Sequence, residues 1–372
     1  MAIQIDFVSN HAVDSEIVRR FYADNWKRKI ALSEKKFYEW QFVNTPNSEK
    51  KDHCVIAYDN KKDEILGVMG LNKRDFYLSN KSYNGAELTT WIVNEHVVGL
   101  GLGAKILGFI QEKFDVLIGM GISEMALPVY MRSGFRYVKS IPRFVKVINL
   151  DPLKSHSQYT NLAFKLVNKW NTSSTNQFFA TEVSPDEYAD LFEFTKEAVN
   201  LFVRDNSHRV WRYEAHPYFH YKQYLVGCSS DTKSGKAFVA FREESSLPDF
   251  KILHIVDLFG EASSIPSAIS FVEAYARENG FDVIDFYCTA SSIYRFMLSS
   301  GWFSINDDLC FQFPHLFHPI EMRTPPTTSL IYWAKNDLSE IADLSKLYVT
   351  KQDADLDRPT LHTIDLITKE SE

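Results

Sequence analysis

The stretch that decides the fold is residues 87–135, which opens with the β-like run Glu-Leu-Thr-Thr-Trp-Ile-Val at 87–93. The glycine-rich turn Gly-Leu-Gly-Leu-Gly-Ala-Lys follows at 99–105, then an apolar helical pattern and a second β-like run at 116–120. The stretch closes on the spacing Tyr130-x-x-x-Gly-Phe. Glycines at a strand-to-helix turn leave backbone N–H groups uncovered, and the helix N-terminus favours negative charge. The stretch therefore predicts a diphosphate site beside a tyrosine that can donate a proton.

Length and composition leave room for two cores and argue against two kinds of partner. The chain has 372 residues, of which 45% are hydrophobic and 14% aromatic, and a formal net charge of −7. A nucleic-acid-binding protein needs a basic face to neutralise phosphates, so we expect no nucleic-acid partner. No run of about 18 apolar residues occurs, so the sequence predicts no spanning helix and no membrane partner.

The four cysteines, at positions 54, 228, 288 and 310, are scattered and form no Cys-x-x-Cys pair. This spacing is typical of neither a zinc site nor a disulfide scaffold. We therefore expect no metal, and interpret the cysteines as reduced core thiols of a cytoplasmic protein.

The N-terminal part alternates helical and β-like patterns. Residues 14–30 have helical spacing with Asp14 or Ser15 as N-cap, and Ser33 is the expected cap of a second helix. Strands are expected at residues 4–9, 53–58, 65–71 and 75–78.

The second half of the chain repeats the first. A shift of 167 residues places Phe-Asp-Val-Leu at 114–117 on Phe-Asp-Val-Ile at 281–284, and Ser-Gly-Phe at 133–135 on Ser-Gly-Trp. A shift of 171 places Trp40-x-Phe-x-x-x-Pro on Trp211-x-Tyr-x-x-x-Pro. Three matches in the same order predict two copies of one α/β unit.

We place the two units at residues 1–155 and 176–328, with a polar connection between them. A tail, residues 329–372, begins with an apolar strand and carries an acidic turn at 353–359 that we expect to be solvated. The alternative is that the carboxylates of this turn hold an ammonium group of the acceptor. The turn lacks the glycine and the distal glutamate of a calcium loop. Its aspartates are Asp353, Asp355 and Asp357.

The first copy resembles the GNAT superfamily of N-acetyltransferases. The matching pattern is a strand that ends at Val93, the turn Val98-Gly-Leu-Gly-Leu-Gly, and Ser123-x-x-Ala-x-x-x-Tyr-x-x-x-Gly-Phe. The family usually has Arg or Gln at Val98 and Asn at Ser123, and Pro128 makes us expect an irregular short helix. The resemblance implies an α/β (α+β) fold of two tandem units, each a mixed, mostly antiparallel sheet flanked by helices.

The resemblance also implies acetyl-CoA, or another acyl-CoA, as donor. Its diphosphate is expected on the glycine turn, and its pantetheine amides on the edge of the preceding strand. The implied donor-binding residues are Ile92, Val93, Asn94, Val98, Gly99, Leu100, Gly101, Leu102, Gly103, Ala104, Lys105, Ser123 and Ala126.

Three residues are candidates for the proton transfers. Tyr130 stands at the family's proton-donor position, and Glu87 matches the position where some members hold a general base. His96 lies nearer the turn and, like Glu95, can act through a water. The alternatives are that Tyr130 is a packed aromatic residue, that Glu87 lies on a solvated strand face, and that the glycines only make a tight turn.

The second copy lacks these groups. The residues that the shift of 167 places opposite Gly99, Gly101, Gly103, Glu87 and Tyr130 are Pro266, Ala268, Ser270, His254 and Met297. Proline has no N–H group and methionine cannot donate a proton. We expect the second unit to close the acceptor site instead, with His216, His220 and Tyr221 as candidate substrate-binding residues.

The sequence therefore predicts an acetyl-CoA-dependent N-acyltransferase whose partner is a small polar amine. The aromatic content and the acidic charge favour an amino sugar, or a nucleotide-linked amino sugar, of surface-polysaccharide synthesis. Two alternatives stay open: aminoacyl transfer from a charged tRNA, as in peptidoglycan-bridge enzymes, and a non-catalytic protein that binds acyl-CoA or a nucleotide sugar.

Overall fold

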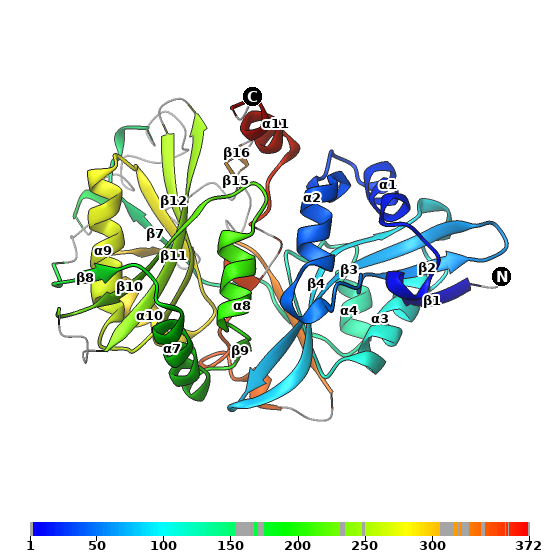
Figure 1. The fold of residues 1–372 in the computed structure, drawn as a ribbon, viewed down its shortest axis with the longest axis horizontal. Coiled ribbons are helices and arrows are strands. Elements are labelled where there is room, and N and C mark those ends of the chain that lie inside the picture. The colour runs from blue at the N-terminus through cyan, green and yellow to red at the C-terminus, as the bar shows by residue number, and fades with distance from the viewer. Residues whose placement is uncertain are drawn as a thin grey trace.

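A computed structural model gives the fold, in which two mixed β-sheets lie side by side and helices cover their faces (Figure 1). Among the residues that it describes, no helix is long and apolar enough to cross a membrane. The described residues are 3–152, 165, 167–169, 175–230, 235–247, 250–305, 316–317, 320–321, 327–335, 339–353, 355 and 357–370.

The first sheet contains seven strands in one path, and a short strand pairs with its third member. All neighbours are antiparallel except β4 and β5, which are parallel. In spatial order the strands are β1 (Ile3–Phe7), β2 (Val55–Asp59), β3 (Glu64–Leu78), β4 (Lys81–Val93), β5 (Val116–Met120), β17 (Leu330–Ala334) and β6 (Arg136–Val138), and β9 (Leu201–Phe202) pairs with β3.

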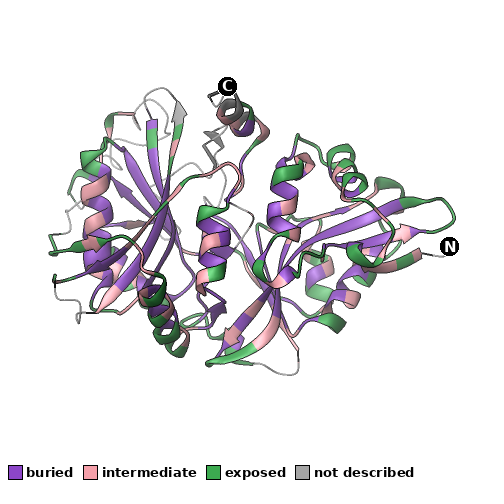
Figure 2. Ribbon diagram, viewed as in Figure 1, coloured by how far each residue is buried: buried purple, intermediate pink, exposed green. Residues whose placement is uncertain are grey.

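Alternation along the strands gives this sheet two buried faces (Figure 2). Ile56 packs on one face with residues of α1 (Ser15–Asn25) and α2 (Lys35–Tyr38). Its neighbours Val55 and Ala57 pack on the other face with the helices next to the glycine turn. Those helices are α3 (Leu102–Lys113) and α4 (Leu127–Arg132).

The second sheet has the same plan. Its only parallel pair is formed by β12 and β13, and one large core lies between the sheet and its helices. In spatial order the strands are β14 (Phe303–Ser304), β7 (Arg143–Val147), β13 (Val283–Tyr287), β12 (Phe250–Gly260), β11 (Lys236–Leu247), β10 (Tyr221–Gly227) and β8 (Phe179–Thr181). The remaining elements with labels are α7 (Pro185–Ala198), α8 (Asn206–Arg209), α9 (Ile265–Glu278), α10 (Ser291–Ser299), the pair β15 (Leu316–Phe317) and β16 (Ile320–Glu321), and α11 (Leu361–Glu370).

Strands of each half of the chain join the sheet of the other half, and one of them is β9, which pairs with β3 in the first sheet. β7 comes from the first half but pairs with β13 and β14 in the second sheet. β17 comes from the tail but pairs with β5 and β6 in the first sheet. The predicted ranges 1–155 and 176–328 stay predictions about sequence units, and most of the polar connection lies outside the described residues.

The backbone register confirms the repeat. The parallel ladder of β4 and β5 runs from Gly85 opposite Val116 to Leu88 opposite Gly119. The ladder of β12 and β13 runs from Ile252 opposite Val283 to Ile255 opposite Phe286, which is the same register shifted by 167 residues. The irregularity next to Leu88 recurs in β12 at the same shift. Two copies of one unit are therefore present at the level of the backbone.

The tryptophans that the second shift, of 171 residues, matches also contact each other and so join the two copies. Trp40 and Trp211 lie in π-helical turns at equivalent positions, Glu39–Val43 and Val210–Glu214. Their rings stack with centroids 5.0 Å apart, and each indole Nε1 donates to the other residue's carbonyl oxygen at 2.9 Å. The repeated tryptophans thus face each other across the contact between the two units.

Some local predictions were wrong. Asp14 caps α1 as expected, but Ser33 does not cap α2, because its hydroxyl donates to the Ile30 carbonyl. Pro128 lies in the first turn of α4, where a missing N–H costs nothing, so the expected irregularity does not occur. Cys228 is exposed and is not a core thiol; Cys310 lies outside the described residues.

Candidate functional site

The site begins where β4 and β5 part. Their ladder ends at Leu88 and Gly119, while β4 continues along β3 to Val93. The extra residue in β4, at Thr89 and Thr90, falls directly after the last pair and adds local twist. Within the described chain, the edge of β4 from 89 to 93 that faces β5 pairs with no strand. An unpaired edge of this kind can hydrogen-bond an extended amide-containing ligand.

The glycine turn lies next to this edge and is open. Gly99 and Gly101 have φ of 86° and 76°, and a Cβ at either position would meet no atom within 4 Å. α3 begins directly afterwards, and the N–H groups of Leu102, Gly103 and Ala104 have no acceptor among the described residues. These uncovered N–H groups and the partial positive charge of the helix N-terminus form a good environment for a diphosphate.

The third glycine of the turn has a packing reason. A Cβ on Gly103 would lie 2.6 Å from the Trp91 ring, so α3 can approach β4 this closely only with glycine there. Val98 and Leu100 are exposed, as is Lys105, whose ammonium group can reach a phosphate bound at the turn. The glycine turn therefore keeps the residues that were predicted to bind the donor diphosphate together on one side of α3.

Other predicted donor contacts are less available. The Asn94 N–H donates to the Leu66 carbonyl, and the Asn94 carbonyl accepts from Val97, so both backbone groups are engaged. The Ile92 side chain is buried, and only its backbone belongs to the β4 edge. Ser123 is exposed and accepts the Ala126 N–H, which positions the start of α4. His96 is exposed beside the glycine turn, and its backbone N–H donates to the Asn94 side chain.

Tyr130 comes from α4 and reaches the β4 edge. Its ring packs edge-on against Trp91, with centroids 5.2 Å apart, and against Phe135 at 5.1 Å. The residue is 2% exposed, yet its hydroxyl makes no hydrogen bond to a described residue. Burial, and then the charge of Asp355, raise its pKa above the ordinary value, so the phenol keeps its proton at neutral pH.

Glu87 lies one residue before the ladder ends, and the prediction of a solvated face is wrong. It is 4% exposed, and Asn72 Nδ2 donates to its Oε2 at 3.4 Å, while Oε1 has no hydrogen-bond partner among the described residues. Burial and the charge of Asp355 raise the pKa of Glu87 to about 8, against the opposing effect of Arg74. A carboxyl group with this pKa can accept a proton near neutral pH.

The acidic turn of the tail lies against β4, and the prediction that it is solvated is wrong. Asp353 and Asp357 are 1% and 3% exposed, and Asp355 accepts from Thr90 Oγ1 of β4 at 3.1 Å. The sequence left open whether these carboxylates hold an ammonium group, but nothing in the spacing of residues 353–357 indicates which strand they contact. The only signal was the alternation of three aspartates in an otherwise mixed segment.

The candidate acceptor residues of the second unit do not form an open site. His216 is buried between Trp40 and Phe219, and its Nδ1 accepts from two backbone N–H groups. The Tyr221 hydroxyl donates to Asp357, while His220 is exposed. His216 and Tyr221 are therefore neighbours, with rings 5.7 Å apart, in the interior between the units.

In the second unit the positions equivalent to the site are closed. The Ser264 and Ser267 hydroxyls at the start of α9 donate to the carbonyls of Gly235 and Gln177. Met297 is fully buried, and His254 forms ion pairs with Glu244 and Asp285. An open turn, a free β-strand edge, a buried carboxyl group and a buried phenol occur together at the first unit.

Comparison with known proteins supports the same fold. No protein-family profile matches the chain. No curated protein matches it in sequence. Saccharomyces cerevisiae N-myristoyltransferase with bound myristoyl-CoA is similar in structure at TM-score 0.53 and 11% identity, over 89% of this chain and 82% of that one.

Two further structures are similar. A GCN5-related N-acetyltransferase from Anabaena variabilis has TM-score 0.53 and 11% identity, over 90% of this chain and 73% of that one. A conserved protein of unknown function from Enterococcus faecalis has TM-score 0.56 and 9% identity, over 92% and 74%. The chain has the GNAT fold, in two units of mostly antiparallel sheet, as the sequence resemblance implied.

Proposed function

We propose that the chain is an acyl-CoA-dependent N-acyltransferase that acetylates a small polar amine by direct transfer. The observation that carries this proposal is the gathering of an open glycine turn, a free β4 edge, Glu87 and Tyr130 at one place. The GNAT fold and the N-acyltransferases among the similar structures support it. The equivalent place in the second unit lacks the open glycine turn, the carboxyl group and the phenol, which supports it as well.

The donor is acetyl-CoA, which supplies an acyl group activated as a thioester. Its diphosphate fits the uncovered N–H groups of residues 102–104 and the Lys105 ammonium, and its amides fit the β4 edge at Ile92 and Val93. A backbone N–H near Val93 polarises the acyl oxygen, since a fixed donor there needs no reorganisation during the reaction.

Glu87 prepares the acceptor. An amine reaches the protein mostly as ammonium, which cannot attack a carbonyl, so it must lose a proton first. Glu87 accepts that proton on its free Oε1, directly or through a water. The neutral nitrogen then forms the N–C bond as the C–S bond breaks.

Tyr130 serves the leaving group. The thiolate that departs is a strong base in a buried place, and the Tyr130 hydroxyl can give it a proton. Because Asp355 and burial keep Tyr130 protonated, the proton is available throughout the ordinary pH range. Protons therefore enter at Glu87 and leave from Tyr130.

The acceptor that we propose is an amino sugar, or a nucleotide-linked amino sugar. A surface hollow of about 370 Å³ near the site supports an acceptor that carries negative charge. Its lining includes Trp26, Lys27 and Lys29, and Arg358 lies over the Trp26 ring at 5.9 Å while it contacts Thr90. Ring and cations next to each other suit a sugar that bears a phosphate.

Titration calorimetry with acetyl-CoA, followed by thiol-release assays on a panel of amino sugars and nucleotide-linked amino sugars, tests the function. We expect Y130F to bind acetyl-CoA as the wild type does and to lose about 10- to 100-fold in kcat, because only the proton donor is removed. The matched control is Met297→Leu at the equivalent position of the second unit, with kcat unchanged.

The two steps fail separately. Wild-type protein that gives no heat with acetyl-CoA would show that the donor assignment is wrong. Donor binding without turnover of any amine would favour a non-catalytic binding protein, and unchanged turnover in Y130F would exclude the acid role of Tyr130.

A further inference from the structure

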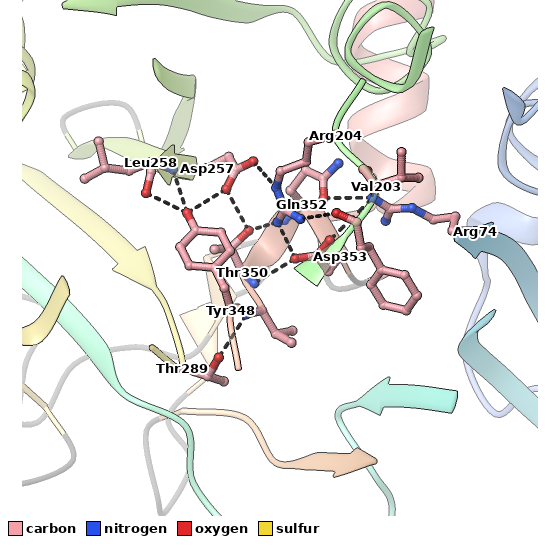
Figure 3. A network of polar contacts seen from close by, with 12 residues as sticks. Arg74, Val203, Arg204, Asp257, Leu258, Thr289, Tyr348, Thr350, Gln352 and Asp353 are labelled. Carbon is pink, nitrogen blue, oxygen red and sulfur yellow. Dashed lines mark hydrogen bonds and ion pairs between the residues drawn. The ribbon is translucent and has the colours of Figure 1, made fainter. Parts of the chain in front are cut away.

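The tail inserts three aspartates between the units, and the outer two are neutralised. Asp353 forms ion pairs with Arg204 and Arg74, at the centre of a buried network that includes Asp257 and Tyr348 (Figure 3). The side chains of Arg74, Arg204, Asp257 and Asp353 are fully buried in this network.

Asp357 is held in the same manner. It accepts from Arg242 Nε at 2.6 Å, from Arg212 Nη2 at 3.2 Å and from the Tyr221 hydroxyl at 2.7 Å. Its side chain has no solvent exposure. Asp355 itself is held by Thr90 and Arg358.

Asp355 differs from Asp353 and Asp357 because one of its oxygens has neither a hydrogen bond nor an ion pair among the described residues. Its Oδ2 takes all the contacts, from Thr90 Oγ1 at 3.1 Å and from Arg358 Nη1 at 3.0 Å. Its Oδ1 has no partner among the described residues, although the side chain is only 12% exposed. An oxygen without a partner, in a side chain that is held in place through its other oxygen, is available to a ligand that donates a hydrogen bond or carries positive charge.

Glu87 presents a second free oxygen close by. Asp353 pairs with Arg74, which lies opposite Gly85 of β4, and Asp355 contacts Thr90 of β4, so the tail runs along β4 past Glu87. The charge of Asp355 acts on both Glu87 and Tyr130. Glu87 Oε1 also has no partner among the described residues, and the residue as a whole is 4% exposed. Two carboxyl groups with one free oxygen each match the needs of an ammonium group, which has three N–H donors.

We propose that Asp355 and Glu87 together form the subsite that binds the ammonium group of the acceptor, so that the tail completes the acceptor site. The inference rests on the proposed function and extends it. Asp355 is the positioning residue, since it stays paired with Thr90 and Arg358, and Glu87 takes the proton. The acceptor class is therefore an amine bound as its cation, rather than an alcohol.

Binding of D-glucosamine, galactosamine and mannosamine, each against the sugar that has a hydroxyl in place of the amine, tests this without turnover. Calorimetry uses the full chain saturated with CoA. We expect at least one amino sugar to bind at least 10-fold more tightly than its hydroxyl counterpart. In Asp355→Asn that preference is lost, while the Kd for acetyl-CoA and the Tm stay at the wild-type values.

Two variants separate charge from structure. Asp355→Glu keeps the negative charge and restores part of the preference for the amine, whereas Asp365→Asn removes an exposed charge from α11 and changes nothing. Equal binding of amine and hydroxyl sugars by the wild type overturns the subsite, as does an unchanged preference in Asp355→Asn. If Asp355→Asn does not fold, the Asp355→Glu variant tests the subsite instead. Loss of the preference for the amine in that variant decides against the subsite, and a retained preference decides for it.

The pH–rate profile gives a readout that a purely structural role would not move. Removing the charge of Asp355 favours the ionised form of Glu87, so the acidic limb moves to lower pH in Asp355→Asn. The other charged groups around Glu87 are Arg74 from β3, Asp353 from the tail and Arg212 after α8, and all three stay in place. A profile identical to the wild type would contradict the placement of Asp355 beside Glu87. Failure of acetyl-CoA binding would instead contradict the proposed function.

Discussion

The two units have the same backbone at the site and opposite side-chain chemistry. Glu87 and His254 occupy the same position of the parallel ladder, opposite Ile118 and Asp285. Glu87 is buried with one free oxygen, whereas His254 is held by Glu244 and Asp285 and contacts Lys351. The comparison shows that the point where two parallel strands separate can hold reactive groups. The side chains at that point decide whether it becomes a functional site or a structural cluster of charged residues.

The helix that follows shows the same contrast. α3 begins with a glycine turn whose N–H groups are open, while α9 begins with Pro266 and with serines that bond to neighbouring segments. The second copy therefore uses its helix start to hold the structure together. Through Arg204, Arg212 and Arg242 it holds the tail next to the first unit.

Matched substitutions at Glu87 and His254 give the largest expected contrast. Glu87→Gln removes the base and should lower kcat about 100- to 1,000-fold at pH 7 with little loss of stability, because the amide keeps the shape. His254→Gln breaks buried ion pairs and should lower the free energy of unfolding by about 1–3 kcal/mol with kcat preserved. Steady-state kinetics and urea unfolding of both variants check this; a reversed pattern would mean that the roles are exchanged.

Two glycines of the same helix region give a smaller contrast. Gly101→Ala puts a Cβ at a positive φ and beside the proposed diphosphate, so we expect about a 10-fold weaker Kd for acetyl-CoA. Gly108→Ala lies within α3 with open space for its Cβ, and should stabilise the fold by up to about 1 kcal/mol without changing the Kd. Calorimetry and thermal unfolding distinguish them, and equal Kd values in both variants would argue against the turn as the diphosphate site.

The smallest effect is a pH dependence of stability. The folded pKa of Glu87 is about 8 and lies above the ordinary value, so the folded state keeps a proton that the unfolded chain releases. The contribution of Glu87 to stability is therefore greatest at low pH and is lost as pH rises through about 8. Glu87→Gln escapes this loss, so its Tm relative to the wild type should be a few degrees higher at pH 9 than at pH 5. A constant difference across that range would mean that the Glu87 pKa is not raised.

Much of the fold was readable from the sequence, because its signals are local. The strand that ends at Val93, the helix after the glycines and the strand at 116–120 are periodic patterns of adjacent residues. The repeat was readable because short matches keep their spacing, and the ladder registers follow the predicted shift of 167. The residues assigned to donor binding and catalysis remain predictions that the experiments above address.

The parts that could not be read depend on contacts between distant residues. Ser33 has the right type for an N-cap, yet a competing carbonyl takes its hydroxyl. Asp353 and Asp357 look like surface acids, and only the arginines that converge on them from three other segments make their burial favourable. No spacing rule connects Asp355 to Thr90, since 265 residues separate them.

By itself the sequence determined the two α/β units, the glycine turn before α3 and the absence of equivalent groups from the second copy. It could do so because these features depend on residue type and on spacings within a few turns. Only the tertiary structure decided that β7 and β17 change sheets, that Glu87 is buried, and that the tail carries Asp355 to it. Burial and charge pairing depend on which segments meet, and that is settled by the packing of the whole chain.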